Sequence, residues 1–149
     1  MSVGEICNRE VVIAYKETDI VEIARLMRQF HVGDIVVVVP HGDQPVPVGI
    51  ITDRDIVIEL IAGEVDLKSV TAGDVMSFDL ITARESDGIW DTLERMKANG
   101  IRRMPVINER GGLEGILTVD DLLVLFSEEL ISLARVTMHQ QRQEKKFRE

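Results

Sequence analysis

The sequence predicts an α/β fold made of two tandem copies of a β-α-β-β-α unit. The first observation is an internal repeat: after a shift of 69 residues, Val3-Gly4-Glu5-Ile6-Cys7 falls on Ala72-Gly73-Asp74-Val75-Met76. The second is a three-residue change of register in a loop, after which the segment GIITDRD (49–55) falls on GILTVDD (115–121). The third is size and composition: 149 residues, 45% apolar and 29% charged, suffice for one compact domain or two very small ones.

The first three elements of each copy follow from local patterns. Short β-branched runs at 11–13 and 80–82 predict the first strands. Apolar residues at helical spacing come next, and Thr18 and Asp87 are the expected N-caps of these helices. Continuous apolar runs at 35–39 and 104–107 predict strands that are buried on both faces.

Each copy closes with a strand and a helix. Loops rich in Gly, Pro or Asp lead into expected strands at 48–51 and 113–117. Thr52 and Thr118 open second helices, which we expect to end near Gly63 and Glu129. The chain beyond Ile131 lacks Gly and Pro, so it predicts a C-terminal helix with a solvated end. The expected organisation is repeat one at 3–62, a linker at 63–74, repeat two at 75–130 and a helical tail at 131–149.

Charge and cysteine usage exclude several classes of protein. The formal net charge of −9 argues against a nucleic-acid partner, because binding a polyphosphate requires a basic face. Cys7 is the single cysteine, so an internal disulfide is impossible. The first twenty residues lack an apolar signal core, and the longest apolar runs are about a quarter of a membrane span. We therefore expect a cytoplasmic protein with no membrane partner.

A unit of about 60 residues, used twice, with a Gly-x-x-Thr-x-x-Asp turn into its last helix, resembles the CBS domain, which is named after cystathionine β-synthase. The resemblance covers residues 3–130. It implies two CBS repeats packed through their sheets into one module, often called a Bateman module. It also implies a regulatory function rather than an enzyme, with adenosine-containing ligands bound in two clefts between the repeats. Ligands of this family include AMP, ADP, ATP, S-adenosylmethionine and NADH.

The Thr-x-x-Asp turns allow two interpretations. Thr52 with Asp55, and Thr118 with Asp121, fit a capping box, in which the Thr oxygen accepts a backbone N–H and the acid reaches back to the cap residue. An ionised carboxylate is also an acceptor suited to the two hydroxyls of a ribose, and the helix N-terminus beside it presents free N–H groups. Both roles are compatible with one site, and the duplicated unit favours ribose binding.

The resemblance assigns further positions to each cleft. It places the base of a nucleotide against the partner repeat, so the aliphatic residues implied are Ile50, Ile81 and Ile101 for the Thr52/Asp55 cleft, and Val12, Val32 and Ile116 for the Thr118/Asp121 cleft. These aliphatic residues also suit an ordinary core.

Basic residues ahead of the second strand meet phosphates in this family. The second repeat has Arg102 and Arg103 there, whereas the first has Gly33 and Asp34. Phosphorylated ligands are therefore expected to prefer the Thr52/Asp55 cleft. A solvated helix end is the alternative interpretation of the two arginines.

Neither a catalytic constellation nor a set of metal ligands is apparent in the sequence. His31, His41 and His139 have no acid or second histidine at ligand spacing, and the carboxylates near Thr52 and Thr118 lie in first helical turns, where acids are favoured anyway. Apolar second helices at 56–62 and 122–126 favour a homodimer. The expected function is a stand-alone sensor of adenine nucleotides that signals through its conformation or to an effector protein. The alternatives are a structural dimerisation module with empty clefts and an unrecognised Mg²⁺-dependent nucleotide hydrolase.

Overall fold

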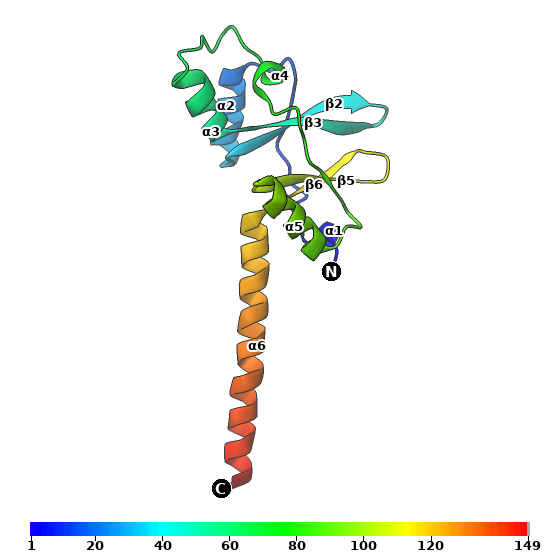
Figure 1. Cartoon of the computed structure of the whole chain (residues 1–149), viewed down its shortest axis with the longest axis vertical. Coiled ribbons are helices and arrows are strands. Elements are labelled where there is room, and N and C mark those ends of the chain that lie inside the picture. Colours follow the sequence, from blue (N-terminus) through cyan, green and yellow to red (C-terminus); the bar gives the residue numbers. More distant parts are fainter. Residues whose placement is uncertain (149) are drawn as a thin grey trace. The chain divides into compact units, whose positions relative to one another are not determined.

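The structure, a computed structural model, describes residues 1–148 and contains two three-stranded sheets with their helices (Figure 1). By contacts the chain divides into two compact units, Met1–Leu117 and Thr118–Glu149. The fold class is confirmed: a mixed α/β chain in which each sequence repeat supplies one sheet.

The first sheet comes from the first repeat, in the order β1-β2-β3. β1 (Ile13–Tyr15) pairs parallel with β2 (Asp34–His41), and β2 pairs antiparallel with β3 (Gln44–Thr52). α2 (Ile20–Phe30) connects β1 to β2, and β3 leads into α3 (Asp53–Asp55) and the π-helical turn η1 (Ile56–Ile61).

The second sheet repeats this plan in the order β4-β5-β6. β4 (Ala83–Arg84) pairs parallel with β5 (Arg103–Ile107), and α5 (Ile89–Asn99) connects them. β6 (Leu113–Thr118) leads directly into α6 (Val119–Arg148). The loop after α2 and the loop after α5 begin at equivalent residues, His31 and Gly100, both in the left-handed conformation that closes a helix.

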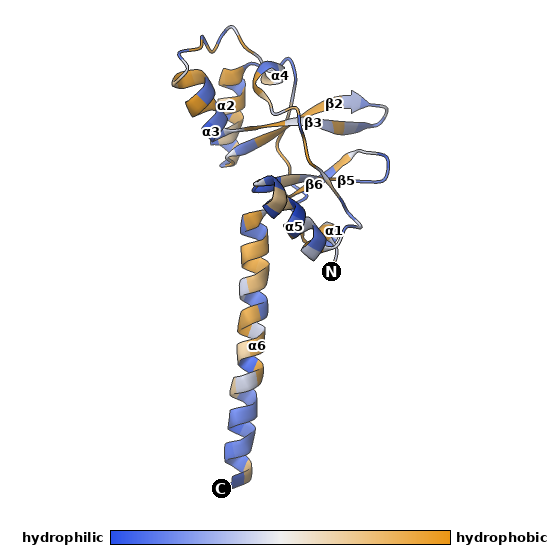
Figure 2. Cartoon of the chain, in the orientation of Figure 1, coloured by the Kyte–Doolittle hydropathy of each residue, from blue (hydrophilic) through white to orange (hydrophobic). Residues whose placement is uncertain are grey.

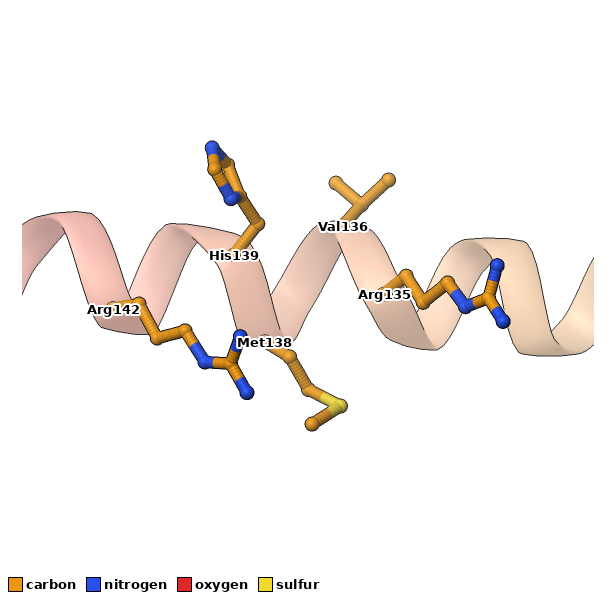
Figure 3. A pocket seen from close by; sticks show the side chains of 5 residues that line it. All are labelled: Arg135, Val136, Met138, His139 and Arg142. Carbon is orange, nitrogen blue, oxygen red and sulfur yellow. The ribbon is translucent and has the colours of Figure 1, made fainter.

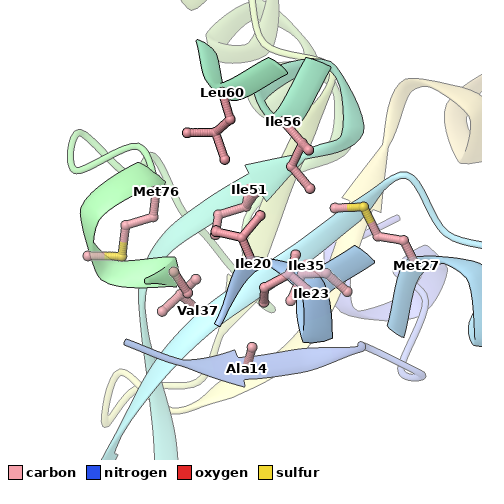
Figure 4. Packing of buried hydrophobic residues seen from close by; sticks show 11 residues of the cluster. Ala14, Ile20, Ile23, Met27, Ile35, Val37, Ile51, Ile56, Leu60 and Met76 are labelled. Carbon is pink, nitrogen blue, oxygen red and sulfur yellow. The ribbon is translucent and has the colours of Figure 1, made fainter. Parts of the chain in front are cut away.

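Two buried clusters hold residues 1–117 together. In the first repeat, apolar side chains of α2 pack onto one face of the first sheet with those of η1 (Figure 4). Ile23, Ile35 and Ile51 at its centre are fully buried. The second cluster joins the two sheets, because Val36 and Val38 of β2 pack with Ile116 of β6. The expected packing of the repeats through their sheets is therefore present.

The structure corrects the expected ends of several elements. The first strands begin two or three residues later than predicted, at Ile13 and Ala83. The N-caps of α2 and α5 are Asp19 and Gly88, each one residue after the predicted cap.

Thr18 and Asp87 have a different role from the one expected. The hydroxyl of Thr18 accepts the Tyr15 N–H at 3.1 Å, and the carboxylate of Asp87 accepts the Arg84 N–H at 2.9 Å. Both side chains therefore bond backward and hold the turn between strand and helix. Short polar side chains bond in either direction along the chain, so the sequence does not distinguish the two roles.

The largest correction concerns the end of the chain. The second helix of repeat two was expected to end near Glu129 and to be followed by a separate helix. Instead α6 continues without a break from Val119 to Arg148, so the expected boundary between 130 and 131 lies inside one helix. No residue between the two predicted helices breaks the pattern, and Glu129, Ser132 and Leu133 all tolerate helical conformation.

Two short helices that the sequence did not predict each bond to the opposite repeat. α1 (Val3–Ile6) begins the first repeat in the sequence but bonds to the second: Val3 N–H donates to the Asp87 carbonyl at 2.8 Å and Gly4 N–H to that of Glu85 at 2.9 Å. Beyond α1, Asn8 and Ile116 exchange two backbone hydrogen bonds of 2.9 Å each. The N-terminal segment is therefore held to the second repeat by backbone hydrogen bonds.

α4 (Ala72–Val75) makes the equivalent contacts with the first repeat. Ala72 N–H donates to the Thr18 carbonyl at 2.8 Å, and Gly73 N–H to that of Lys16 at 2.9 Å. After it, Ser77 N–H donates to the Ile50 carbonyl at 3.1 Å. Each short helix therefore stands at the start of one repeat in the sequence and bonds to the other repeat in the structure. The expected boundary between 74 and 75 lies inside α4.

The glycines of the two GI-x-T segments are required by this exchange. A Cβ on Gly115 would lie 2.7 Å from the Cys7 Sγ and 2.8 Å from the Asn8 carbonyl oxygen. The three atoms nearest to a Cβ on Gly49 would all belong to the Met76 side chain, with its Cγ at 2.7 Å. Cys7 and Met76 are equivalent in the repeat, so each sheet accepts one side chain of the exchanged segment above a glycine.

We expect Gly115→Ala to lower the free energy of unfolding by about 1–3 kcal/mol, because the added methyl group must displace a backbone carbonyl. Gly49→Ala should cost less, since the flexible Met76 side chain can move aside. Denaturant unfolding of both variants beside the wild type measures the difference. Equal stability of Gly115→Ala and the wild type would contradict the close approach of the N-terminal segment.

Candidate functional site

The first candidate corner lies where β3 ends and α3 begins. Asp55 N–H donates to the Thr52 Oγ1 at 3.1 Å, and Thr52 N–H donates to the Asp55 Oδ2 at 2.8 Å. This is the capping box that the sequence predicted. Both residues are half-buried, and one hydrogen bond occupies only part of the acceptor capacity of a carboxylate. The cap therefore orients the Asp55 carboxylate and leaves it able to accept further hydrogen bonds.

The second corner, at the start of α6, repeats this geometry within residues 118–121. Asp121 N–H donates to the Thr118 Oγ1 at 3.1 Å, and Thr118 N–H donates to the Asp121 Oδ2 at 2.9 Å. The Thr118 hydroxyl also donates to that carboxylate oxygen at 2.7 Å. Each repeat thus carries a carboxylate fixed at the N-terminus of a helix, beside backbone N–H groups that favour anions.

Two of the six aliphatic residues assigned to base pockets lie together. Val12 and Val32 line a groove of about 570 Å³ in the first unit, and the side chains of Leu26 and Phe30 from α2 form another part of its wall. Phe30 is 50% exposed, so an aromatic ring faces solvent at this groove. An open apolar wall with an aromatic side chain suits a flat heterocycle.

The other four aliphatic residues are distributed differently. Ile116 is only 6% exposed and belongs to the cluster between the sheets, against which Ile50 also packs. Ile81 and Ile101 are half-buried and lie outside the helices and strands, just before β4 and β5. Ile116 is therefore part of the core in this structure, while the others keep a partly open face.

Arg103 and Asp34 form an ion pair between the repeats. The Arg103 Nε lies 2.7 Å from the Asp34 Oδ1, and the two side chains are 30% and 17% exposed. They occupy equivalent positions, 69 residues apart, at the starts of β5 and β2. Asp34 stands where the second repeat has its arginine, and its charge is compensated by Arg103, the residue assigned to phosphate binding. Arg102 beside it is exposed.

Within 1–148, no group of three or more His, Cys, Asp or Glu side chains is placed to hold a metal ion. In the same range, no helix combines the length and apolar character that crossing a bilayer requires. One further hollow is lined by α6 alone, through Arg135, Val136, Met138, His139 and Arg142, so it has no second wall to enclose a ligand (Figure 3).

Comparison with known proteins identifies the repeats. The family model described as "CBS domain" matches twice, at residues 3–62 and 72–128. An uncharacterised protein of Methanopyrus kandleri, MK0525, is 37% identical over 123 residues, which are 83% of this chain and 61% of that protein. The CBS domain-containing protein YhcV of Bacillus subtilis is 32% identical over 123 residues, covering 83% of this chain and 84% of YhcV. The chain thus spans less than two thirds of the length of MK0525.

Two similar crystal structures contain ligands. The CBS domain pair of protein MJ0100, in complex with 5-methylthioadenosine and S-adenosyl-L-methionine, aligns with a TM-score of 0.75 at 26% identity, over 87% of this chain and 98% of that one. The CBS domain protein PAE2072 from Pyrobaculum aerophilum, complexed with AMP, aligns with a TM-score of 0.71 at 28% identity, over 82% and 90%.

Proposed function

The chain belongs to the CBS domain family, and we propose that it is a regulatory module that binds adenosine-containing nucleotides between its repeats. The observation that carries this proposal is the pair of matching corners, in which Thr52/Asp55 and Thr118/Asp121 present an oriented carboxylate beside a helix N-terminus. The complexes of MJ0100 and PAE2072 support the ligand class, because their ligands share an adenosine moiety.

The proposed ligands are AMP, ADP and ATP, with S-adenosylmethionine and NADH as further members of the class. Asp55 and Asp121 would accept from the ribose hydroxyls, and the apolar groove at Val12 and Val32 suits the base. Arg102 and Arg103 would contact phosphates. Signalling then follows from linkage: a ligand that binds one arrangement of the repeats better than another shifts their equilibrium by no more than that difference in affinity. We propose that the module regulates through ligand binding and carries out no catalysis of its own.

A thermal-shift series with AMP, ADP, ATP, S-adenosylmethionine and NADH tests the proposal. We expect at least one of them to raise the melting temperature in a concentration-dependent manner, while the matching guanosine nucleotide does so less. An unchanged melting temperature with every adenosine compound would favour a dimerisation module with empty clefts. Conversion of ATP to ADP in the presence of Mg²⁺ would instead reveal the nucleotide hydrolase.

The proposed contact of Arg103 with a phosphate competes with its ion pair to Asp34. Asp34→Asn removes the carboxylate charge that now compensates Arg103, so we expect ATP or AMP to bind roughly fivefold more tightly. Neutral adenosine should bind with unchanged affinity, because it lacks the phosphate. Calorimetric titration of both ligands measures the two effects. Equal changes for ATP and adenosine would show that Arg103 does not contact the phosphates.

We also propose that the protein forms a two-fold homodimer. Val57, Ile58 and Ile61 on η1 are 55%, 42% and 60% exposed, and the first half of α6 is largely apolar on its surface (Figure 2). Exposed apolar surface of this kind, on either unit, marks an interface. Light scattering at micromolar concentration should give twice the 16.7 kDa mass of the chain. A monomer with and without nucleotide would contradict the dimer.

A further inference from the structure

α6 carries an exposed apolar stripe with the spacing of a helix-pairing seam. Val124, Ile131 and Met138 are each seven residues apart, with Ser127 and Ala134 between them. Alternating steps of three and four residues keep such positions on one face of a helix. The side chains of Val124, Ile131 and Met138 are 58%, 53% and 53% exposed, so this face is open to solvent in the chain.

The two small residues of the stripe favour close approach of a second helix. Ser127 and Ala134 have short side chains, and the Ser127 hydroxyl donates to the Val124 carbonyl oxygen at 2.7 Å. This hydroxyl is therefore already satisfied within its own helix. Burying it in a seam would cost little, because no hydrogen bond is lost.

A row of charged residues runs beside the stripe, also at seven-residue spacing: Asp121, Glu128, Arg135 and Arg142. The first two residues of this row are acidic and the last two are basic. Figure 3 shows Arg135 and Arg142 on the same side of the helix as Met138, with Val136 and His139 on another side. Within residues 1–148, neither Glu128 nor Arg135 forms an ion pair in the chain.

The whole helix shows the same polarity. Residues 119–134 hold four acidic and no basic side chains, whereas 135–148 hold five basic and one acidic. An antiparallel copy of such a helix meets acidic residues with basic ones along its length, while a parallel copy meets like charges. The sequence of charges is therefore complementary to itself in one orientation only.

We propose that α6 pairs antiparallel with the α6 of a second copy, across the stripe Val124-Ser127-Ile131-Ala134-Met138. Interleaving the stripe positions of the two helices places the two-fold axis beside residues 132 and 133. Glu128 of each copy then lies near Arg135 of the other, and Asp121 near Arg142. This inference rests on the dimer part of the proposed function, and its test uses Glu128 and Arg135, which lie outside the Thr118/Asp121 corner. It specifies the surface and the direction of pairing.

Other occupants fit this face less well. A membrane surface with anionic lipids attracts amphipathic helices whose apolar face is flanked by Lys and Arg. Here Asp121 and Glu128 flank the N-terminal half of the stripe, and Asp120 and Glu129 add further negative charge to that half. Binding of an unrelated protein would not explain why the charge row is complementary to its own reversed copy. Self-complementarity favours the second copy.

Charge-reversal variants test the pairing by its dimer dissociation constant in sedimentation equilibrium. Glu128→Arg and Arg135→Glu should each weaken the dimer roughly tenfold, because two symmetry-related attractive pairs become repulsive. The double variant Glu128→Arg/Arg135→Glu should restore the constant to within about threefold of the wild type. Glu129→Arg is the matched control: it makes the same change on the neighbouring residue, outside the row, and should have little effect. Circular dichroism verifies that α6 stays helical.

Each outcome is informative. A monomeric wild type overturns both the dimer and this inference. A dimer that ignores all of these charge changes leaves the homodimer standing and overturns the antiparallel pairing of α6. In a parallel pair each single reversal would exchange one like-charge contact for another, so the dissociation constant would likewise stay unchanged. Spin labels at Ser132 and Lys146 in a Cys7→Ala background provide a second readout: the antiparallel pair predicts a short distance at Ser132 and an axial separation of about 40 Å at Lys146, whereas a parallel pair predicts short distances at both.

Discussion

Asp55→Ala is expected to weaken the binding of AMP or ATP by roughly tenfold to a hundredfold. A hydrogen bond to a charged group contributes about 1.5–3 kcal/mol, and tenfold in affinity corresponds to about 1.4 kcal/mol. Asp121→Ala should change the tighter binding phase much less, because the arginines assigned to phosphate contact accompany the Thr52/Asp55 corner. Calorimetric titration of the two variants compares the corners directly.

Loss of the helix cap must be separated from loss of the ligand contact. Asp74→Ala is the matched control, since Asp74 forms the same kind of capping box, with the Thr71 N–H donating to its Oδ2 at 2.9 Å, in α4. It should lose a similar amount of stability, about 0.5–2 kcal/mol, and leave the nucleotide affinity unchanged. If Asp121→Ala abolishes the tighter phase while Asp55→Ala preserves it, the two clefts are assigned the wrong way round. If neither affects binding, both corners are caps only.

The largest effect on stability is expected for Ile51→Ala. Ile51 is fully buried where α2, η1 and the first sheet meet, so the variant loses the burial of its side chain and leaves a cavity (Figure 4). Such substitutions cost about 2–5 kcal/mol, which lowers the melting temperature of a chain of this size by roughly 5–15 °C. Thermal and denaturant unfolding measure both quantities.

Ile61→Ala is the control for the same chemical change at an exposed position, since Ile61 is 60% exposed. Measured at concentrations where the protein is monomeric, it should alter the free energy of unfolding by about 0.5 kcal/mol or less. A similar loss for both variants would contradict the position of Ile51 at the centre of the core.

The repeat and its corners were predictable because they depend on local chemistry. Glycine at 49 and 115, followed by threonine and aspartate at fixed spacing, favours a strand end and a capped helix, and both are present here. The strand positions were predicted less accurately, because Val11 and Val12 pack against the buried clusters although they precede β1.

The rest depends on contacts between distant segments. The Arg103–Asp34 pair joins residues 69 apart, and nothing local to either distinguishes a phosphate ligand from an ion-pair partner. The contacts of α1 with the second repeat and of α4 with the first likewise depend on backbone hydrogen bonds, which the pattern of side chains in the sequence does not predict. The continuity of α6 was missed because absence of a helix-breaking residue permits one helix or two with equal ease.

The most direct test of the account is to follow backbone amide resonances by NMR while AMP is added. We predict saturable shifts at Thr52 and Asp55, with smaller or later shifts at Thr118 and Asp121, and with changes at Ile81 and Ile101 in the same titration. Saturable shifts that leave both Thr-x-x-Asp corners unmoved, or no shifts with any adenosine compound, would contradict the proposal that this protein binds nucleotides between its repeats.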